Sequence, residues 1–279
     1  MRKLWITGSN GQLGQALNQV LDPMEFEVIN TEKDDLNVAD IDAVISFGDV
    51  NRPDIIINCS GLTGIEECER NPAEAYRVNA IGARNLAIIA AKLSAKMIQI
   101  STDDVFDGKA NRPYTEFDPA SPITVYGNSK LAGENFVREF THKHFIIRSS
   151  WTYGLGNNFV TNVLKLARNG ETVYVKEGEI SSPTSDLEIA KFILYIMNTN
   201  EYGTYHVTCN GICSRKEFAE EILALAGMQV PVMEIKDSDY QRPEYAVLNN
   251  FILEILGDYQ LPDWKKSLKE FMKVMEERR

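Results

Sequence analysis

A glycine-rich turn near the start of the chain restricts the fold more than any other feature of the sequence. Gly8, Gly11 and Gly14 follow the spacing Gly-x-x-Gly-x-x-Gly, directly after the apolar run Leu4-Trp5-Ile6. Such a turn between a strand and a helix lets the backbone approach a phosphate closely. We expect it to hold the pyrophosphate of a dinucleotide through Gly8, Asn10, Gly11, Gln12, Leu13 and Gly14. The alternative is a flexible turn whose glycines match this pattern by coincidence.

Apolar runs alternate with amphipathic stretches through the first half of the chain. This order is typical of a parallel sheet with helices on its faces. The predicted strands are residues 4–6, 26–29, 54–58, 97–100 and 145–147, and the predicted helices are 12–21, 40–50, 72–95 and 126–140. Because the strand at 54–58 is apolar almost throughout, we expect it in the interior of the sheet.

Beyond about residue 150 the pattern is less regular. It predicts strands at 172–175 and 204–207 and helices at 214–226 and from 262 to the end, with Ser214 and Glu217 as a capping box. We expect an α/β fold of the Rossmann-like, doubly wound parallel type with a smaller C-terminal substrate lobe. Residues 1–150 are the predicted dinucleotide-binding domain, which some later segments rejoin, and residues 151–279 mainly form the substrate-binding lobe.

Tyr126 and Lys130 lie four residues apart in the predicted helix at 126–140. Residues with this spacing share one face of a helix, so we expect the ammonium group to lower the pKa of the phenol. The tyrosine could then donate a proton to a carbonyl oxygen that gains charge as a hydride arrives. With 11 tyrosines in the chain, a chance match is the alternative. Together with the glycine turn, the pair indicates hydride transfer between a nicotinamide and a ketone.

Two hydroxyl residues, Ser101 and Thr102, directly follow the predicted strand at 97–100 and begin a long loop at 102–122. Ligands of open parallel sheets bind beyond the carboxyl ends of the strands. Thr102 is therefore a candidate for polarising the same carbonyl group. The alternative is that its hydroxyl caps a turn.

An acidic and a basic residue stand where the second strand should meet the adenosine ribose. Glu32 suits a ribose 2′-hydroxyl, whereas the adjacent Lys33 suits a 2′-phosphate. A solvated surface pair is the alternative for both residues. The sequence therefore predicts NADP(H) or NAD(H) without a preference.

The net charge of −11 disfavours a nucleic acid or an anionic membrane surface as a partner. No run approaches the ~20 apolar residues that span a bilayer, and the apolar run that Gly8 ends is too short for a signal peptide. We expect a cytoplasmic protein whose four cysteines are reduced.

Many short motifs, in order and nearly from end to end, resemble those of the dTDP-4-dehydrorhamnose reductase family of extended short-chain dehydrogenase/reductases. The segments that carry the resemblance are 6–14, 57–59, 78–82, 101–103, 105–108, 126–134, 150–151, 156–160, 182–184, 242–243 and 261–264. The resemblance implies reduction of the 4-keto group of a dTDP-6-deoxy-hexulose, the last step to dTDP-L-rhamnose. It thus implies a nucleotide-sugar substrate and bacterial polysaccharide synthesis.

The family resemblance also implies a role for individual residues. Thr102, Tyr126 and Lys130 would form the catalytic set. Further cofactor contacts would come from Asn37, Cys59, Ser60, Gly61, Asn79 and Ser101, besides the glycine turn and the Glu32-Lys33 pair. Substrate contacts would come from Thr63, Thr102, Asp103, Asp104, Tyr126, Trp151, Asn158 and Arg242, with Trp151 against the sugar nucleotide and Arg242 at its phosphates.

The sequence departs from the family pattern on the substrate side. Asp104 stands where the family has a tyrosine, and Leu62 lies in a Ser-Gly-Leu-Thr segment that replaces Ala-Ala-Tyr-Thr. Ser181 replaces the glycine of Gly-x-Pro-Thr. The Asp104 carboxylate would repel a dianionic nucleotide unless it faces away or binds a sugar hydroxyl. The ketone of another sugar nucleotide is therefore an alternative substrate.

Two further activities fit the same motifs. One is an epimerase that uses the same residues and regenerates its cofactor. The other is a non-catalytic NADP-binding subunit, since a regulatory subunit of methionine adenosyltransferase also resembles this family. The family implies a monomer or a homodimer.

We expect no metal site. Gln15 and Ala16 are neutral where some family members have acidic residues for a metal-bridged dimer, and we expect His142 and His144 in an exposed turn. The acidic stretch of Glu66, Glu67 and Glu69 is predicted to be a solvated loop that could border the pocket, and His206 a packed or edge-strand residue.

Overall fold

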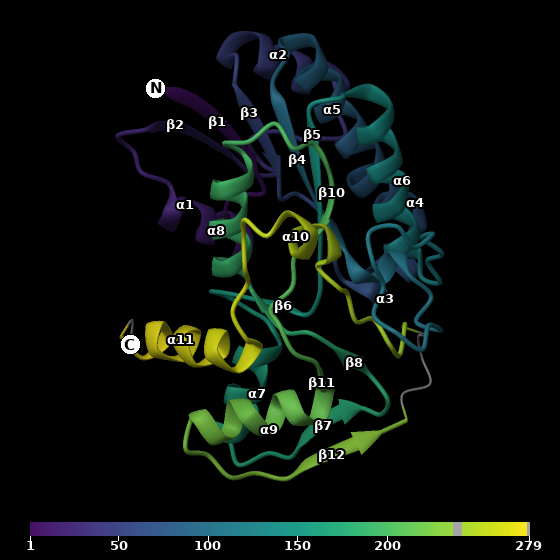
Figure 1. The fold of residues 1–279 in the computed structure, drawn as a ribbon, viewed down its shortest axis with the longest axis vertical. Coiled ribbons are helices and arrows are strands. Elements are labelled where there is room, and N and C mark those ends of the chain that lie inside the picture. Colours follow the sequence, from purple (N-terminus) through teal and green to yellow (C-terminus); the bar gives the residue numbers. More distant parts are fainter. Residues whose placement is uncertain (237–241, 278–279) are drawn as a thin grey trace.

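The computed structural model describes residues 1–236 and 242–277. In these ranges the main sheet has six parallel strands in the order β10-β5-β4-β3-β1-β2 (Figure 1). The strands are β1 (Arg2–Thr7), β2 (Phe26–Thr31), β3 (Ile55–Asn58), β4 (Lys96–Thr102), β5 (His144–Ser149) and β10 (Gly203–His206). The expected interior place of the strand at 54–58 is confirmed, because β3 pairs with both β1 and β4. The doubly wound α/β fold is confirmed as well.

Alternate residues of the strands form the two hydrophobic layers beside the sheet. Leu4 and Ile57 pack with α1 (Gln12–Val20) and α8 (Asp186–Ile196) on one face. Trp5 and Ile56 face the other way, toward α2 (Ile41–Asn51), α5 (Gly82–Leu93) and α6 (Val125–Phe140). This follows from the two-residue period of a strand, and it explains why the buried strands are apolar at nearly every position.

The helix predicted at 72–95 is not continuous. It consists of α4 (Pro72–Tyr76), a π-helical turn η1 (Arg77–Ile81) and α5. The wide turn carries Asn79, whose side chain bonds the backbone of Leu62 and the hydroxyl of Ser129. A π-turn inserts one residue into a helix without changing its apolar period greatly, so the sequence pattern did not reveal it.

The acidic stretch predicted to be a loop is a short helix, α3 (Ile65–Arg70). Glu66 and Glu67 lie in its first turn, where a negative charge is favourable, and Arg70 pairs with Glu66 one turn away (3.1 Å). Cys68 turns inward and is buried. The helix is only six residues long, which is too short for a periodic pattern.

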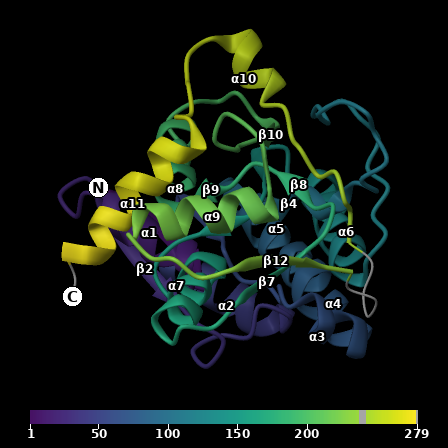
Figure 2. The same cartoon turned by 90° about the horizontal axis from the view of Figure 1, so that it is seen from below.

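A second hydrophobic core lies beyond the carboxyl ends of the strands (Figure 1). Its helices are α7 (Phe159–Arg168), α9 (Arg215–Leu225) and α11 (Trp264–Glu277). Figure 2 shows α9 and α11 at this end of the molecule, where Phe218 and Trp264 meet edge to face. The predicted capping box of Ser214 and Glu217 is confirmed at the start of α9. The short strands are β6 (Thr152–Tyr153), β7 (Val173–Lys176), β8 (Ile180–Ser181), β9 (Thr184–Ser185), β11 (Cys213–Ser214) and β12 (Val232–Ile235).

The chain returns from the second core to the sheet. After β9, α8 packs against α1, and β10 then pairs with β5 at the edge of the sheet, Gly203 opposite Phe145. The helix α10 (Phe251–Leu256) lies beside β10. His206, in β10, is both buried and on an edge strand. Among the described residues, no helix combines the length and the apolar character that crossing a bilayer requires.

Candidate active site

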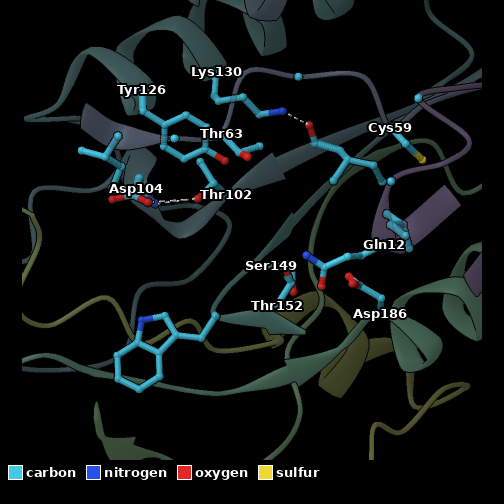
Figure 3. A pocket seen from close by; sticks show the side chains of 18 of the residues that line it. Gln12, Cys59, Thr63, Thr102, Asp104, Tyr126, Lys130, Ser149, Thr152 and Asp186 are labelled. Carbon is cyan, nitrogen blue, oxygen red and sulfur yellow. Dashed lines mark hydrogen bonds between the residues drawn. The ribbon is translucent and has the colours of Figure 1, made fainter. Parts of the chain in front are cut away.

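A cavity of about 1160 Å³ lies between the carboxyl ends of the sheet strands and the second core. Its wall contains the glycine turn, the ends of β4 and β5, one face of α6 and residues from the second half of the chain (Figure 3). A site in this position agrees with the rule that open parallel sheets bind ligands beyond the carboxyl ends of their strands. Gly8, Asn10, Gly11, Gln12, Leu13 and Gly14, the residues predicted to hold a pyrophosphate, all line it.

The glycine turn is closely packed. A Cβ atom on Gly14 would lie 2.5 Å from the backbone of Ser9, so only glycine allows α1 to begin so near β1. Glu32 stabilises the turn, because its Oε1 accepts hydrogen bonds from the Ser9 hydroxyl (2.8 Å) and from the Asn10 backbone N–H. Its carboxylate thus stands at the end of β2, beside the turn. The backbone N–H groups at the start of α1 suit a phosphate.

Four residues predicted to contact the cofactor do not line the cavity, namely Glu32, Lys33, Asn37 and Asn79. Glu32 is half-buried beside the glycine turn, and Lys33 is exposed. The Asn37 side chain accepts a hydrogen bond from the backbone of Ala39 (3.0 Å). Contact of Glu32 or Lys33 with the adenosine ribose stays a prediction.

Tyr126 and Lys130 lie on the buried face of α6 and both line the cavity. A Cβ atom on Gly127 would lie 2.1 Å from the backbone oxygen of Asp104, so this glycine lets α6 approach the residues after β4. The close approach brings the Tyr126 ring to Thr102, as Figure 3 shows. Tyr126 therefore faces the same cavity as the glycine turn, 9% exposed, rather than the packed interior.

The expectation that Lys130 lowers the pKa of Tyr126 was wrong for this structure. Burial, and after it the Asp104 carboxylate, raise the pKa of the Tyr126 phenol well above its usual value. The Lys130 Nζ instead donates a hydrogen bond to the backbone carbonyl of Ile100 (2.6 Å), and burial lowers the pKa of Lys130 to about 8. The phenol thus keeps its proton near neutral pH, as a proton donor must.

Thr102 lines the cavity and also caps a turn, the 3-10 helix η2 (Asp103–Val105). Its Oγ1 accepts a hydrogen bond from the Asp104 backbone (3.1 Å) and donates one to Asp103 Oδ1 (3.0 Å). Burial, and after it the Asp104 carboxylate, raise the pKa of Asp103 to about 7. The alternative for Thr102, that its hydroxyl caps a turn, is thus confirmed, and its role in polarising a carbonyl group stays a prediction.

Asp104 neither faces away from the cavity nor lacks a partner. It is buried on the cavity wall, and Arg242 Nη2 lies 3.0 Å from its Oδ2. The repulsion expected from this carboxylate is offset by the guanidinium group. Arg242 also lines the cavity, but one of its nitrogen atoms is already bound to a carboxylate.

Trp151 lines the cavity, with the guanidinium group of Arg215 lying 3.4 Å from the centre of its ring system. Arg215 is buried and bonds Glu179 through Nε (3.0 Å). Stacking of this kind fixes the plane of the guanidinium group. The backbone of Trp151 has a φ of 41°, which is unusual for a residue other than glycine.

The remaining predicted contacts divide into two groups. Cys59, Ser60, Gly61, Thr63, Ser101 and Asp103 line the cavity. Asn79 and Asn158 do not line it and support the wall instead. Asn79 holds the backbone of Leu62, as described above, and Asn158 caps α7 and donates to the Gln12 side chain (3.1 Å). Leu62 packs with Cys68 and Tyr126.

Several wall residues were not predicted from the sequence, most of them from the second half of the chain. They include Ser149, Glu179, Asp186 and Arg215. Asp186 and Arg215 each occupy the first position of a helix, directly after a serine. The capping box at Ser214 located the start of α9, and that signal could have drawn attention to Arg215.

Among the described residues, no cluster of three or more histidine, cysteine or acidic side chains could hold a metal ion. The four cysteines are unpaired. His144 does not lie in an exposed turn as expected: it begins β5, half-buried, with Nδ1 2.6 Å from the Thr141 carbonyl oxygen.

The wall of the cavity fits a nicotinamide dinucleotide. The close-packed turn at the start of α1 suits its pyrophosphate. Within the described residues, two buried polar atoms of wall residues, Ser149 Oγ and Asp186 Oδ2, have no hydrogen-bond partner in the protein. Buried polar atoms are usually paired, so these two suit a polar ligand.

Comparisons with known proteins agree with this geometry. A family model described as the RmlD substrate binding domain matches residues 1–277. The spore coat polysaccharide biosynthesis protein SpsK of Bacillus subtilis (strain 168) is 37% identical over 278 residues, which cover 98% of this chain and 97% of that protein. The dTDP-4-dehydrorhamnose reductase of Aggregatibacter actinomycetemcomitans is 34% identical over 287 residues, with 96% and 98% covered. The crystal structure of dTDP-4-dehydrorhamnose reductase from Bacillus anthracis str. Ames in complex with NADP is similar at a TM-score of 0.96 and 38% identity, with 98% of this chain and 100% of that chain covered.

Proposed function

The chain belongs to the dTDP-4-dehydrorhamnose reductase family, and from this premise we propose that it is a nicotinamide-dependent oxidoreductase that reduces the 4-keto group of dTDP-4-dehydrorhamnose. The product is dTDP-L-rhamnose. One observation carries the proposal: Tyr126 and Thr102 line the same cavity as the glycine turn. A proton donor and a dinucleotide site thus share one space.

When bound, the cofactor supplies a hydride to the carbonyl carbon. The protein stabilises the negative charge that develops on the carbonyl oxygen and donates a proton to it. Tyr126 transfers its proton to that oxygen, which becomes the 4-hydroxyl group. The raised pKa of Tyr126 keeps the phenol protonated until the oxygen becomes more basic. Thr102 holds the carbonyl oxygen beside the phenol and turns its hydroxyl from Asp103 to the substrate.

Lys130 has a positioning role in this proposal. It is buried, and its ammonium group lies between the carbonyl of Ile100 and the cavity. From this place it can bind a ribose hydroxyl and hold the cofactor beside Tyr126. Cys59, Ser60 and Gly61 continue the cofactor side of the wall from β3 toward Lys130.

The second core forms the substrate side of the cavity. We assign the sugar nucleotide to the part of the wall made by Trp151, Arg215 and Arg242, which come from the chain beyond residue 150. The bond from Arg215 to Glu179 uses Nε, so among the described residues its two terminal nitrogen atoms are available for a phosphate. Asp104, paired with Arg242, is placed to accept a hydrogen bond from a sugar hydroxyl.

The proposal needs only the cofactor and a nucleotide sugar as partners. A net charge of −11 favours neither nucleic acid nor an anionic surface. The described residues of one chain form the wall of the cavity, so a monomer is sufficient and a homodimer is compatible. Four unpaired cysteines fit a cytoplasmic site of action.

The test is the Tyr126→Phe variant. With dTDP-4-dehydrorhamnose as substrate and NADH and NADPH supplied in turn, we expect kcat to fall by about 10²- to 10⁴-fold because the proton donor is lost. Cofactor affinity should stay within about threefold. Loss of absorbance of the reduced nicotinamide measures the rate. Tyr174→Phe, at an exposed position on β7, is the matched control and should leave the rate unchanged.

The same assay separates the alternatives. A reductase consumes one reduced cofactor for each sugar reduced, whereas an epimerase gives no net consumption and a non-catalytic subunit binds the cofactor without turnover. A normal rate for Tyr126→Phe would exclude the role assigned to this residue. Turnover only with a different keto-sugar nucleotide would transfer the activity to that substrate.

A further inference from the structure

Two buried polar atoms in the cavity wall are unexplained by the protein itself. Ser149 and Asp186 are each 3% exposed, and among the described residues neither Ser149 Oγ nor Asp186 Oδ2 has a hydrogen-bond partner. Leaving such a buried group unpaired is unfavourable. Both residues line the cavity, so a ligand in the cavity would lie next to them. The pair therefore has the properties of a polar subsite.

Ser149 places one end of this subsite beside Thr102, and Asp186 lies toward Gln12. Ser149 is the last residue of β5 and pairs in register with Thr102, the last residue of β4. Asp186 begins α8 and lies against Gly154, where a Cβ atom would come within 2.6 Å of Asp186 Oδ2. Figure 3 shows Ser149 and Asp186 in one part of the wall with Gln12, apart from Tyr126 and Lys130.

A nicotinamide dinucleotide bound as proposed must extend from the glycine turn to Tyr126. Its redox ring then passes the carboxyl ends of β4 and β5, where Ser149 stands beside Thr102. The ring carries one substituent that forms hydrogen bonds, the carboxamide, with one acceptor oxygen and one NH₂ donor. An acidic oxygen and a hydroxyl group are complementary partners for these two atoms.

We propose that Asp186 Oδ2 accepts a hydrogen bond from the carboxamide NH₂ group of the cofactor, while Ser149 Oγ donates one to the carboxamide oxygen. The inference rests on the proposed function and assigns the nicotinamide end of the cofactor to two residues of this chain. By fixing the carboxamide, the two contacts set which face of the ring meets the substrate beside Tyr126.

Other groups fit these atoms less well. The pyrophosphate would be repelled by a carboxylate, and the glycine turn already offers it N–H groups. The other buried acidic side chains of this wall have partners: Asp104 pairs with Arg242, Glu179 pairs with Arg215, and Asp103 accepts a hydrogen bond from Thr102. Among the described residues, Asp186 is thus the buried acid of the cavity wall that has a carboxylate oxygen without a hydrogen-bond partner.

The test compares two oxidised cofactors that differ in one group. NADP⁺ has the carboxamide NH₂, and 3-acetylpyridine adenine dinucleotide phosphate has a methyl group in its place but keeps the oxygen. At pH 8.5, above the raised pKa of Asp186 of about 7, we expect the unaltered protein to bind NADP⁺ about tenfold or more tightly than the analogue by calorimetry, since a hydrogen bond to a charged acceptor is lost. In Asp186→Ala the two dissociation constants should agree within about twofold. If NAD⁺ binds more tightly, the corresponding NAD⁺ pair is used.

Three further variants make the result specific. Glu188→Ala, on the same helix and outside the main cavity, should retain the full preference. Asp186→Asn keeps an acceptor oxygen and should restore part of it. Ser149→Ala should weaken both ligands alike, because both keep the ring carbonyl. Thermal unfolding of each variant checks that it is folded.

Three results would overturn the inference. They are no preference in the unaltered protein, a full preference in Asp186→Ala, or an equal loss of affinity in Asp186→Ala for 2′-phospho-ADP-ribose, which lacks the nicotinamide. Any of these can occur in a protein that still oxidises NADPH with a keto sugar, and then only this inference fails. A protein that binds no dinucleotide would remove the proposed function as well.

Discussion

The Asp104 side chain is 3% exposed, whereas the side chain of its partner Arg242 is 31% exposed. The two residues therefore depend on the ion pair to different degrees. Without Arg242, a carboxylate would be left buried beside Asp103. Without Asp104, the guanidinium group could still reach water.

We expect Arg242→Gln to lower the free energy of unfolding by about 3 kcal/mol, because it removes one partner of a buried pair. Asp104→Asn should cost only about 1 kcal/mol, and the double variant should lose less than the sum of the two. Urea unfolding of the four proteins measures this cycle. Equal and additive losses would show that the pair does not stabilise the fold.

His206 should make stability depend on pH. Its Nδ1 lies 3.1 Å from the carbonyl oxygens of Tyr114 and Asn249, and Nε2 lies 3.5 Å from Arg148 Nη1. Burial, and after it the Arg148 charge, lower the pKa of His206 to about 3. The unfolded chain, with a histidine pKa of about 6.5, therefore binds the proton more readily. The contribution of neutral His206 to the stability of the fold is fully present above pH 6.5 and is lost as the pH falls toward 3.

Between pH 7 and pH 4 we expect the unaltered protein to lose about 3 kcal/mol of stability more than His206→Gln does. The comparison with the variant is needed because Asp103 and Asp186 act in the opposite sense. Their raised pKa values, each about 7, stabilise the fold at acid pH and lose this effect as the pH rises. Parallel curves of unfolding free energy against pH for the two proteins would contradict the prediction.

For single residues, the positions of the reactive side chains could be predicted from the sequence better than the environments around them. The spacing of Tyr126 and Lys130 put both on one helix face, and both line the cavity. The direction of the Tyr126 pKa shift could not be predicted, because it depends on burial and on Asp104, which approaches from another element. The stacking of Arg215 on Trp151 joins residues 64 positions apart and has no local signal.

Among the elements, α6 depends on a close contact that a single methyl group would prevent. Gly127 lies against the backbone of Asp104, and that contact sets the position of Tyr126. Gly127→Ala should lower the free energy of unfolding by about 1–3 kcal/mol and reduce kcat by up to about 100-fold through misplacement of the phenol. Urea unfolding and steady-state kinetics measure the two effects.

Gly64→Ala is the matched control for this variant. Gly64 also lines the cavity, but a Cβ atom there would meet only the Glu67 side chain at 3.4 Å. Its stability and rate should stay near those of the unaltered protein. If Gly127→Ala behaves in the same way, the close packing of α6 is not what positions Tyr126.

Elements with a long, regular apolar period could be predicted from the sequence. The strands and helices predicted for the first half are present, most with ends shifted by a few residues. The exceptions have physical causes. α3 is too short for a period, and η1 adds one residue within a helix. In the second half α7 and α8 were missed, because no recognised cap or strand signal marked where they begin.

For the whole molecule, the question is whether the sheet and the second core unfold together. The first core includes α8, which follows β9, and β9 pairs with β6 at the junction of the two. Trp5 is buried in the sheet and Trp264 in the second core, so each reports on one part. The loss of either core should expose surface on the other.

We therefore expect one transition for both tryptophans. Two variants, Trp151→Phe with Trp264→Phe and Trp151→Phe with Trp5→Phe, leave one fluorescent reporter each, and their urea midpoints should coincide after correction for their own stabilities. NADPH at about 100 times its dissociation constant should raise the free energy of unfolding by about 2.7 kcal/mol at both reporters. If the second core unfolds at a lower urea concentration than the sheet, and its midpoint does not change with NADPH, the two cores are independent folding units.

The division of the chain between the sheet and the second core was harder to predict from the sequence than the glycine turn. The sequence placed most of the sheet before residue 150 because those strands alternate with helices. β10 is only four residues long and lies 53 residues after β5, so its pairing with β5 could not be derived from local pattern. The second core has no long strands, and its helices are held mainly by contacts distant in sequence.

The position of β10 at the sheet edge has a consequence for how the protein is made. A nascent chain leaving the ribosome releases β1 to β5 well before β10, so the outer edge of β5 stays bare while the second core is being synthesised. Bare strand edges invite pairing with other chains. Slow elongation between these segments would lengthen that exposure, and chaperone demand in the cell should follow the speed of translation there.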